Sequence, residues 1–124
     1  MPKNKKILIA DDDPFLGSTY KVNFQKTGHD VEVVGDGNQV MASLEEQIPD
    51  VVILDLIMPR KDEFTVLEEI RKSEKFKSIP VIVSSNLGQK EDIERGMELG
   101  ANDYVIKSNM TMEELIKKVE AVIK

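Results

Sequence analysis

Residues 51–59 read Val-Val-Ile-Leu-Asp-Leu-Ile-Met-Pro, so four aliphatic side chains run directly into the carboxylate of Asp55. A continuous apolar run of this length is typical of a strand covered on both faces in a parallel sheet. Further short apolar or β-branched runs lie at residues 7–10, 31–34, 81–83 and 104–106. An amphipathic stretch follows each of these candidate strands. The alternation predicts an α/β fold, a single doubly wound five-stranded parallel sheet with five helices and right-handed crossovers.

The stretches between the candidate strands carry helical spacing and helix-end signals. Tyr20 and Phe24 are four residues apart, which places them on one apolar face of a first helix. Thr111 and Glu114 have the spacing of a capping box at the start of the last helix. Residues 35–37, Gly-Asp-Gly, predict a turn that opens a helix rather than a dinucleotide-binding fingerprint.

The composition limits the classes of protein to which the chain can belong. Its 124 residues and 40% hydrophobic content fit one globular domain over residues 1–124. The absence of cysteine excludes disulfides and thiolate metal sites. With 23 acidic against 17 basic residues, the chain lacks the clustered positive charge that nucleic acid binding needs. No apolar run is long enough for a signal peptide or a membrane span, so we expect a cytoplasmic location and no membrane partner.

Polar side chains follow the candidate strands at the points where they end. Residues 11–13 are all aspartate, Asp55 follows the third strand, Ser85 the fourth and Lys107 the fifth. Each taken alone has an ordinary structural use, such as capping a helix. The carboxyl ends of parallel strands meet at one edge of a sheet, however, so these groups are expected in one crevice. Crowded carboxylates require protons or a cation, and all-oxygen ligands suit Mg²⁺ or Mn²⁺. The sequence therefore predicts a phosphoryl-transfer site.

Four segments, taken in order, resemble the response-regulator receiver domains of two-component signalling. They are residues 7–14 (ILIADDDP), 55–59 (DLIMP), 79–85 (IPVIVSS) and 100–107 (GANDYVIK). The resemblance covers the chain from Lys6 to the last helix, and it implies a flavodoxin-like sheet with strand order 2-1-3-4-5. It also implies a regulatory domain rather than an enzyme that turns over a substrate. A sensor histidine kinase or a phosphotransfer protein would supply the phosphoryl group.

The resemblance assigns roles to the acidic residues at the strand ends. Asp55 matches the phosphoacceptor, and Asp11 and Asp12 match the acidic pair of the family. Mg²⁺ would then be held by Asp12, Asp55 and the backbone carbonyl of Ile57, with Asp11 acting through water. These four residues form the implied metal site.

The resemblance also implies a switch. Lys107 and Ser85 would bind the phosphoryl oxygens and complete the catalytic set with Asp55. Ser85 and Tyr104 match the switch pair, so phosphorylation would reshape the face formed by the fourth helix, fifth strand and fifth helix. A downstream output domain or protein, or a second copy in a phosphorylation-dependent homodimer, would read that face. The family usually has proline after the lysine, where this chain has Ser108, which leaves open whether that bond is cis.

Two alternatives come from other classes of protein. An aspartyl-phosphate phosphatase also places a nucleophilic aspartate after a strand, but it typically carries a second acid two positions later, where this chain has Ile57. A pseudo-receiver keeps the fold as an interaction module without phosphorylation, although such modules tend to lose the acidic pair, the acceptor or the lysine. Outside the site, His29, the only histidine, is expected on the surface, and Met97 is expected in the core.

Overall fold

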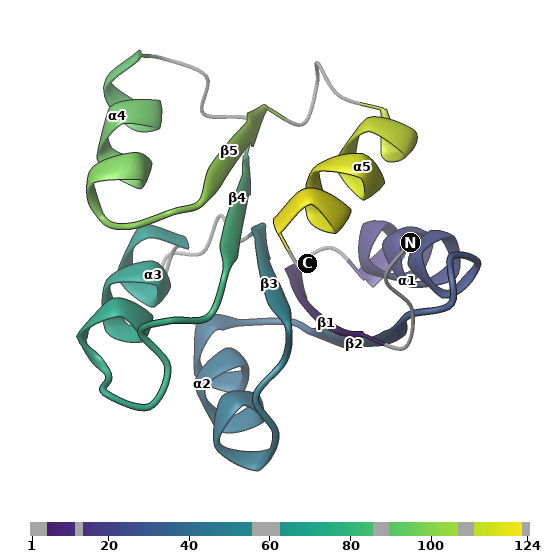
Figure 1. Cartoon of the computed structure of the whole chain (residues 1–124), viewed down its shortest axis with the longest axis horizontal. Coiled ribbons are helices and arrows are strands. Elements are labelled where there is room, and N and C mark those ends of the chain that lie inside the picture. The colour runs from purple at the N-terminus through teal and green to yellow at the C-terminus, as the bar shows by residue number, and fades with distance from the viewer. Residues whose placement is uncertain (1–4, 12–13, 56–62, 86–89, 107–110, 123–124) are drawn as a thin grey trace.

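The computed structural model describes residues 5–11, 14–55, 63–85, 90–106 and 111–122, along which strands and helices alternate (Figure 1). The strands are β1 (Lys6–Asp11), β2 (Asp30–Val34), β3 (Val51–Asp55), β4 (Val81–Ser85) and β5 (Asp103–Ile106). The helices are α1 (Pro14–Gln25), α2 (Gly37–Glu46), α3 (Glu63–Lys72), α4 (Lys90–Glu98) and α5 (Met112–Val122). Every predicted strand is confirmed, with ends that differ by at most two residues. Within the described ranges, no helix has the length and apolar character needed to cross a membrane.

The described strands form one parallel sheet in the order β2-β1-β3-β4-β5, which confirms the expected topology. Figure 1 shows α1 and α5 on one side of the sheet and α2, α3 and α4 on the other. Because helices cover both faces, the central strands need apolar side chains at consecutive positions rather than at alternate ones. Accordingly, every residue of β3 and of β4 is buried.

The sheet divides the core into two layers. The layer beside α1 and α5 contains Ile7, Ile9, Tyr20, Phe24, Val31, Val51, Ile53, Ile82, Val105, Leu115 and Val119. The layer beside α2, α3 and α4 contains Leu8, Ala10, Val40, Leu44, Val52, Leu54, Val66, Leu67, Ile70, Phe76, Ile79, Val81, Val83 and Ala101. Successive side chains of a strand point to opposite faces, so a residue two positions further along enters the same layer.

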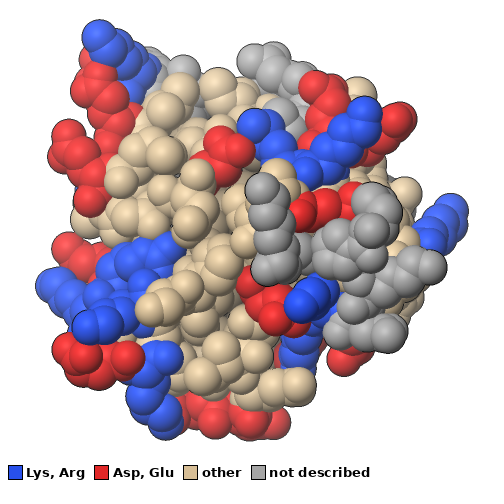
Figure 2. Space-filling view, in the orientation of Figure 1, with Lys and Arg blue, Asp and Glu red and all other residues tan. Residues whose placement is uncertain are grey.

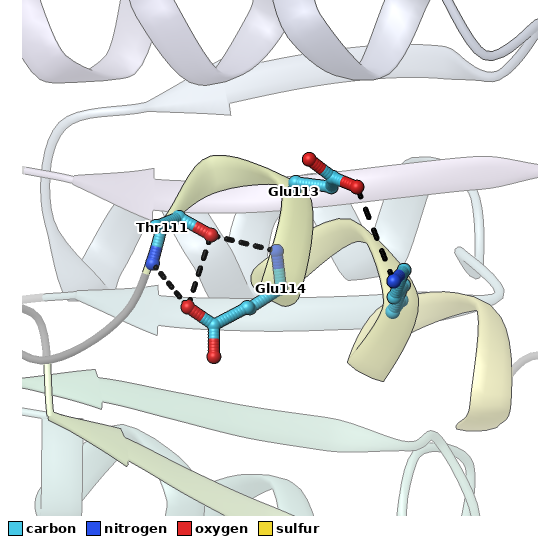
Figure 3. A network of polar contacts seen from close by, with 4 residues as sticks. Thr111, Glu113 and Glu114 are labelled. Carbon is cyan, nitrogen blue, oxygen red and sulfur yellow. Dashed lines mark hydrogen bonds and ion pairs between the residues drawn. The ribbon is translucent and has the colours of Figure 1, made fainter.

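α2 and α5 begin at side-chain caps that the sequence predicts. Asp36 accepts a hydrogen bond from the backbone N–H of Gln39 at 2.9 Å, which confirms the turn that opens α2. At α5 the Thr111 hydroxyl accepts from the N–H of Glu114, and the Glu114 carboxylate accepts from the N–H of Thr111, both at 3.1 Å (Figure 3). The reciprocal bonds make the predicted capping box. The hydrogen bonds from the backbone and then the side chain of Thr111 lower the pKa of Glu114 below its ordinary value.

Arg71, near the end of α3, fastens that helix to the segments that lead into β4 and β5. Its guanidinium donates to the carbonyl oxygens of Ile79 (2.8 Å), Gly100 (2.9 Å) and Lys77 (3.1 Å), and to Oδ1 of Asn102 (2.9 Å). Burial lowers the pKa of Arg71 below its ordinary value. An arginine nevertheless stays charged in a protein, so these are charge-assisted bonds.

Two sequence-based predictions about single residues are wrong. His29 is buried, with 4% of its surface exposed, and its Nε2 lies 3.5 Å from Oε2 of Glu120. The reason is that α5 packs over the turn that leads into β2, a contact between segments far apart in the sequence. Met97 is 45% exposed, because the neighbouring Gly96 is the residue that α4 turns toward the sheet.

Charged side chains of both signs share the surface. Figure 2 shows acidic side chains beside the basic ones on the face in view, with no unbroken basic stripe among the described residues there. Some of them form ion pairs, such as Lys75 with Glu45 at 3.1 Å and Lys77 with Glu74 at 3.0 Å. A nucleic acid surface would instead gather lysine and arginine on one face.

Candidate functional site

Two acidic side chains meet at the carboxyl edge of the sheet. β1 ends at Asp11 and β3 ends at Asp55, and the strand register pairs these two residues directly. Asp11 is 2% exposed and Asp55 is 1% exposed. Parallel strands of matching register therefore bring two buried carboxylates side by side, as their positions at the strand ends predict.

A polar group from α1 also reaches this pair. The hydroxyl of Tyr20 donates a hydrogen bond to Oδ2 of Asp55 at 3.4 Å. Tyr20 is 8% exposed and belongs to the apolar layer beside α1 and α5. The sequence places Tyr20 on the apolar face of the helix, but it does not show that the hydroxyl reaches Asp55. The available signal was a tyrosine at an apolar helix position, because a buried phenol needs a polar partner.

At the carboxyl edge, the predicted acceptor Asp55 and the predicted switch residue Ser85 leave the sheet on opposite faces, from the ends of the neighbouring strands β3 and β4. Asp55 comes two residues after Ile53, so its side chain leaves the sheet on the side of α1 and α5. Ser85 is fully buried and comes two residues after Val83, so it leaves on the side of α2, α3 and α4. Tyr104 packs against the layer on that same side. Ser85 and Tyr104 therefore share one face of the sheet.

Tyr104 lies against α4 at a point where that helix has no side chain. A Cβ at Gly96 would lie 2.8 Å from Cδ2 and 3.1 Å from Cε2 of the Tyr104 ring. The same Cβ would lie 3.5 Å from Cε1 of Phe64, and Arg95 is stacked over the Phe64 ring at 4.9 Å from its centroid. The place of the Tyr104 ring thus depends on α4 and on the absence of a side chain at Gly96.

The other residues of the predicted site lie outside the described residues. They are Asp12, Ile57 and Lys107. Ser108, before which the sequence leaves a cis bond open, lies outside the described residues as well. Within the ranges that the structure describes, no group of three or more His, Cys, Asp or Glu side chains is arranged to hold a metal ion. The described contribution to the predicted metal site is therefore the carboxylate pair of Asp11 and Asp55.

The carboxylate pair has the chemistry of a site for a hard cation. Two like charges about 4 Å apart repel by about 4 kcal/mol at an effective dielectric constant of 20. Burial adds to this cost, because it disfavours the charged form of each group. A divalent cation that binds carboxylate oxygens relieves both effects. Asp11 and Asp55 thus fit Mg²⁺, and an ionised Asp55 is also a nucleophile.

Three features together define a class of signalling domain. They are a doubly wound sheet with this strand order, paired carboxylates at its carboxyl edge, and a buried serine on the same face of the sheet as a tyrosine. The family described as "Response regulator receiver domain" matches residues 7–120, and the chain belongs to this family. It is therefore a receiver domain of two-component signalling, and a regulatory domain.

Comparisons with single proteins agree with the family. The chain is 36% identical over 119 residues to the DNA-binding dual master transcriptional regulator RpaA of Synechocystis. The matched region covers 96% of this chain and 49% of RpaA. The chain spans about half the length of the curated relatives it matches.

Solved structures share the whole fold. The receiver domain of the Francisella response regulator 1452 has a TM-score of 0.89 and 32% identity, with 97% of each chain covered. The receiver domain of the sensor histidine kinase PA1611 from Pseudomonas aeruginosa, solved with a magnesium ion coordinated in its active site cleft, has a TM-score of 0.86 and 28% identity. That match covers 97% of this chain and 98% of the PA1611 domain.

Proposed function

We propose that Asp55 is the phosphoacceptor of this receiver domain. The observation that carries the proposal is the buried pair of Asp11 and Asp55, which are matched in register at the carboxyl edge of the sheet. In the transfer, a carboxylate oxygen of Asp55 forms a bond to phosphorus while the bond from phosphorus to the donor's leaving group breaks. The leaving group departs with the bonding electron pair. With acetyl phosphate as the donor it leaves as acetate, so Asp55 neither gains nor loses a proton.

We assign Mg²⁺ to the same edge of the sheet. Asp12, Asp55 and the backbone carbonyl of Ile57 would hold it, with Asp11 acting through water. When bound, the ion would offset the negative charge of the carboxylates and of the incoming phosphoryl oxygens. The magnesium ion in the cleft of the PA1611 domain supports this assignment, as does the all-oxygen character of the acidic pair.

We also propose that Lys107, Ser85 and Tyr104 convert the phosphoryl group into a change of shape. The phosphoryl group carries up to two negative charges, one more than the carboxylate that it replaces, and strong acceptor oxygens that Lys107 and the Ser85 hydroxyl can bind. Movement of Ser85 would make room on the face where Tyr104 packs against α4. The response would then appear on α4, β5 and α5.

Mass spectrometry of the intact protein tests the acceptor. Incubation with acetyl phosphate and Mg²⁺ is expected to add one phosphoryl group to the parent and none to Asp55→Asn. Asp30→Asn is the matched control, because Asp30 is exposed at the start of β2, and it should be phosphorylated like the parent. If Asp55→Asn gains the same Mg²⁺-dependent phosphoryl group, the acceptor is another residue. If the parent gains none from any donor, the pseudo-receiver alternative is correct.

Nuclear magnetic resonance tests the switch. Beryllofluoride with Mg²⁺ mimics the phosphoryl group, and backbone amide shifts are expected to spread from the acidic edge to α4, β5 and α5. Shifts confined to the residues around Asp11 and Asp55 would mean that the acceptor is occupied without a switch.

The partners follow from the family at a coarse level. We propose a sensor histidine kinase or a phosphotransfer protein as the donor, and an output domain or protein, or a second copy of this domain, as the reader of the α4-β5-α5 face. RpaA is a DNA-binding regulator, and the chain matches about half of its length. The cytoplasmic location expected from the sequence stays a prediction.

A further inference from the structure

We infer that Tyr20 is a positioning residue whose hydroxyl holds the carboxylate of Asp55 in one orientation for phosphoryl transfer. The inference rests on the proposed role of Asp55 and extends the site to a residue of α1. It begins from the hydrogen bond between the Tyr20 hydroxyl and Oδ2 of Asp55, which joins groups 35 residues apart at 3.4 Å inside the protein.

The approach of α1 to the sheet explains how the hydroxyl reaches Asp55. Gly17 lies three residues before Tyr20, so both occupy the face of α1 that packs on the sheet. A Cβ at Gly17 would lie 2.8 Å from Cγ1 of Val33 and 4.0 Å from Cβ of Asp11. The helix can therefore approach β1 and β2 this closely only without a side chain at Gly17. That approach sets the height of the Tyr20 ring above the sheet and lets its hydroxyl extend to the acceptor.

The hydrogen bond acts on the group that must react. A carboxylate turns easily about its last torsion, which is broad and roughly two-fold. A donor at Oδ2 limits that rotation and thereby sets the direction in which Oδ1 points. Hydrogen bonds to an ionised acceptor are stronger than neutral ones, and the buried surroundings of Asp55 reduce their screening. The 3.4 Å distance is long for such a bond, as is common before a catalytic complex forms and tightens it.

The hydroxyl can be separated from the packing role of the ring. The Tyr20 ring fills the layer that it shares with Phe24, and Tyr20→Phe keeps that ring while it removes only the hydroxyl. Thr19→Ala is the matched control, because it removes a hydroxyl from the exposed face of the same helix. A purely structural role of Tyr20 predicts that Tyr20→Phe and Thr19→Ala load phosphate at the same rate.

The first experiment measures the rate at which acetyl phosphate and Mg²⁺ load the acceptor, followed by mass spectrometry of the intact protein. We expect Tyr20→Phe to load about fivefold more slowly than the parent, which corresponds to about 1 kcal/mol of barrier. The loading rate should depend on the acetyl phosphate concentration in the same way in the variant as in the parent. Tyr20 is only 8% exposed and has little surface with which to contact acetyl phosphate. Thr19→Ala should load at the parent rate. An equal or faster loading rate in Tyr20→Phe overturns the inference. A faster rate would mean that the Tyr20 hydroxyl mainly withdraws charge from the Asp55 carboxylate and thereby slows its attack, and an equal rate would mean that the hydroxyl has no effect.

The second experiment measures the response in the parent protein, and the Tyr20→Phe variant serves only to assign the resonance. The chain has two tyrosines, so labelling with ¹³Cζ-tyrosine gives two resonances, which Tyr20→Phe assigns. Beryllofluoride with Mg²⁺ should move the Tyr20 resonance, because its hydrogen-bond acceptor becomes part of the mimic. If the parent loads on Asp55 while this resonance stays in place, only the role of Tyr20 is wrong. If the parent itself takes no phosphoryl group, the proposed function fails and the role of Tyr20 falls with it.

Discussion

Replacing Arg71 by methionine removes the hydrogen bonds that tie α3 to the segments entering β4 and β5. The bonds to the carbonyl oxygens of Ile79 and Gly100 are partly buried, whereas those to Lys77 and Asn102 are exposed. A buried hydrogen bond to a charged group contributes about 1.5–3 kcal/mol. Partial exposure and the desolvation that lowers the pKa of Arg71 reduce this to about 1 kcal/mol for each partly buried bond. The expected loss in the free energy of unfolding is therefore about 2 kcal/mol.

This loss converts into a measurable shift of the melting temperature. An unfolding entropy of about 2.1 cal/mol/K per residue amounts to about 0.26 kcal/mol/K for 124 residues. A change of about 2 kcal/mol then lowers Tm by about 8 °C. Thermal melts followed by circular dichroism measure the shift, with urea unfolding as a second measurement. Arg71→Lys should lie between the parent and Arg71→Met, because an ammonium group cannot reproduce the planar fork.

Lys72→Met is the matched control for this experiment. Lys72 is the next basic residue of α3, and its ion pair with Glu68 is long, at 3.9 Å, between side chains that are 75% and 50% exposed. Such a pair contributes little, so Tm should stay within about 2 °C of the parent. If Arg71→Met melts no lower than Lys72→Met, the Arg71 bonds do not stabilise the fold and the estimate above is refuted.

Three further predictions concern the switch, the last helix and the metal. Gly96→Ala puts a Cβ 2.8 Å from the Tyr104 ring, so the ring must move. The Tyr104 ring resonances should therefore shift before phosphorylation. Unchanged resonances would refute the close contact between Gly96 and the Tyr104 ring. The pKa of Glu114 is lowered in the folded state, so its stabilisation is present above the unfolded pKa and is lost as the pH falls through the folded pKa. The difference in urea midpoint between the parent and Glu114→Gln should therefore shrink as the pH falls from the unfolded pKa of Glu114 through its folded pKa. A difference that stays constant over this range contradicts the stabilising role of Glu114. Chelation of Mg²⁺ should stop the phosphorylation of Asp55 by acetyl phosphate. Phosphorylation at an undiminished rate would exclude a role for Mg²⁺ in the transfer.

Local pattern was enough to predict the strands and the helix caps. Residues 51–54 and 81–83 are continuously apolar, a pattern typical of a strand covered on both faces, and both are fully buried. The capping box of Thr111 and Glu114 depends on residues three positions apart, so its spacing is visible in the sequence. The fold class and the edge at which Asp11 and Asp55 meet follow from such local signals together with the topology of parallel sheets.

Side-chain contacts between distant segments did not follow from the sequence. His29 is buried because α5 packs over its turn, and nothing within the neighbouring residues indicates that contact. Gly96 weakens a helix when judged by local propensity, yet in the structure it makes room for the ring of Tyr104. Local propensity measures only the cost of a residue within its own element, whereas packing depends on what the neighbouring elements place against it.

The sequence by itself determined the order of strands and helices, the single α/β sheet and the acidic character of its carboxyl edge. These properties depend on hydrophobic period and on residue type at strand ends, both of which are local. Only the tertiary structure decided that Tyr20 reaches Asp55, because that contact requires α1 to lie close over the sheet at Gly17. A distance of 3.4 Å between side chains 35 residues apart is set by how helix and sheet pack together, and no pattern along the chain encodes it directly.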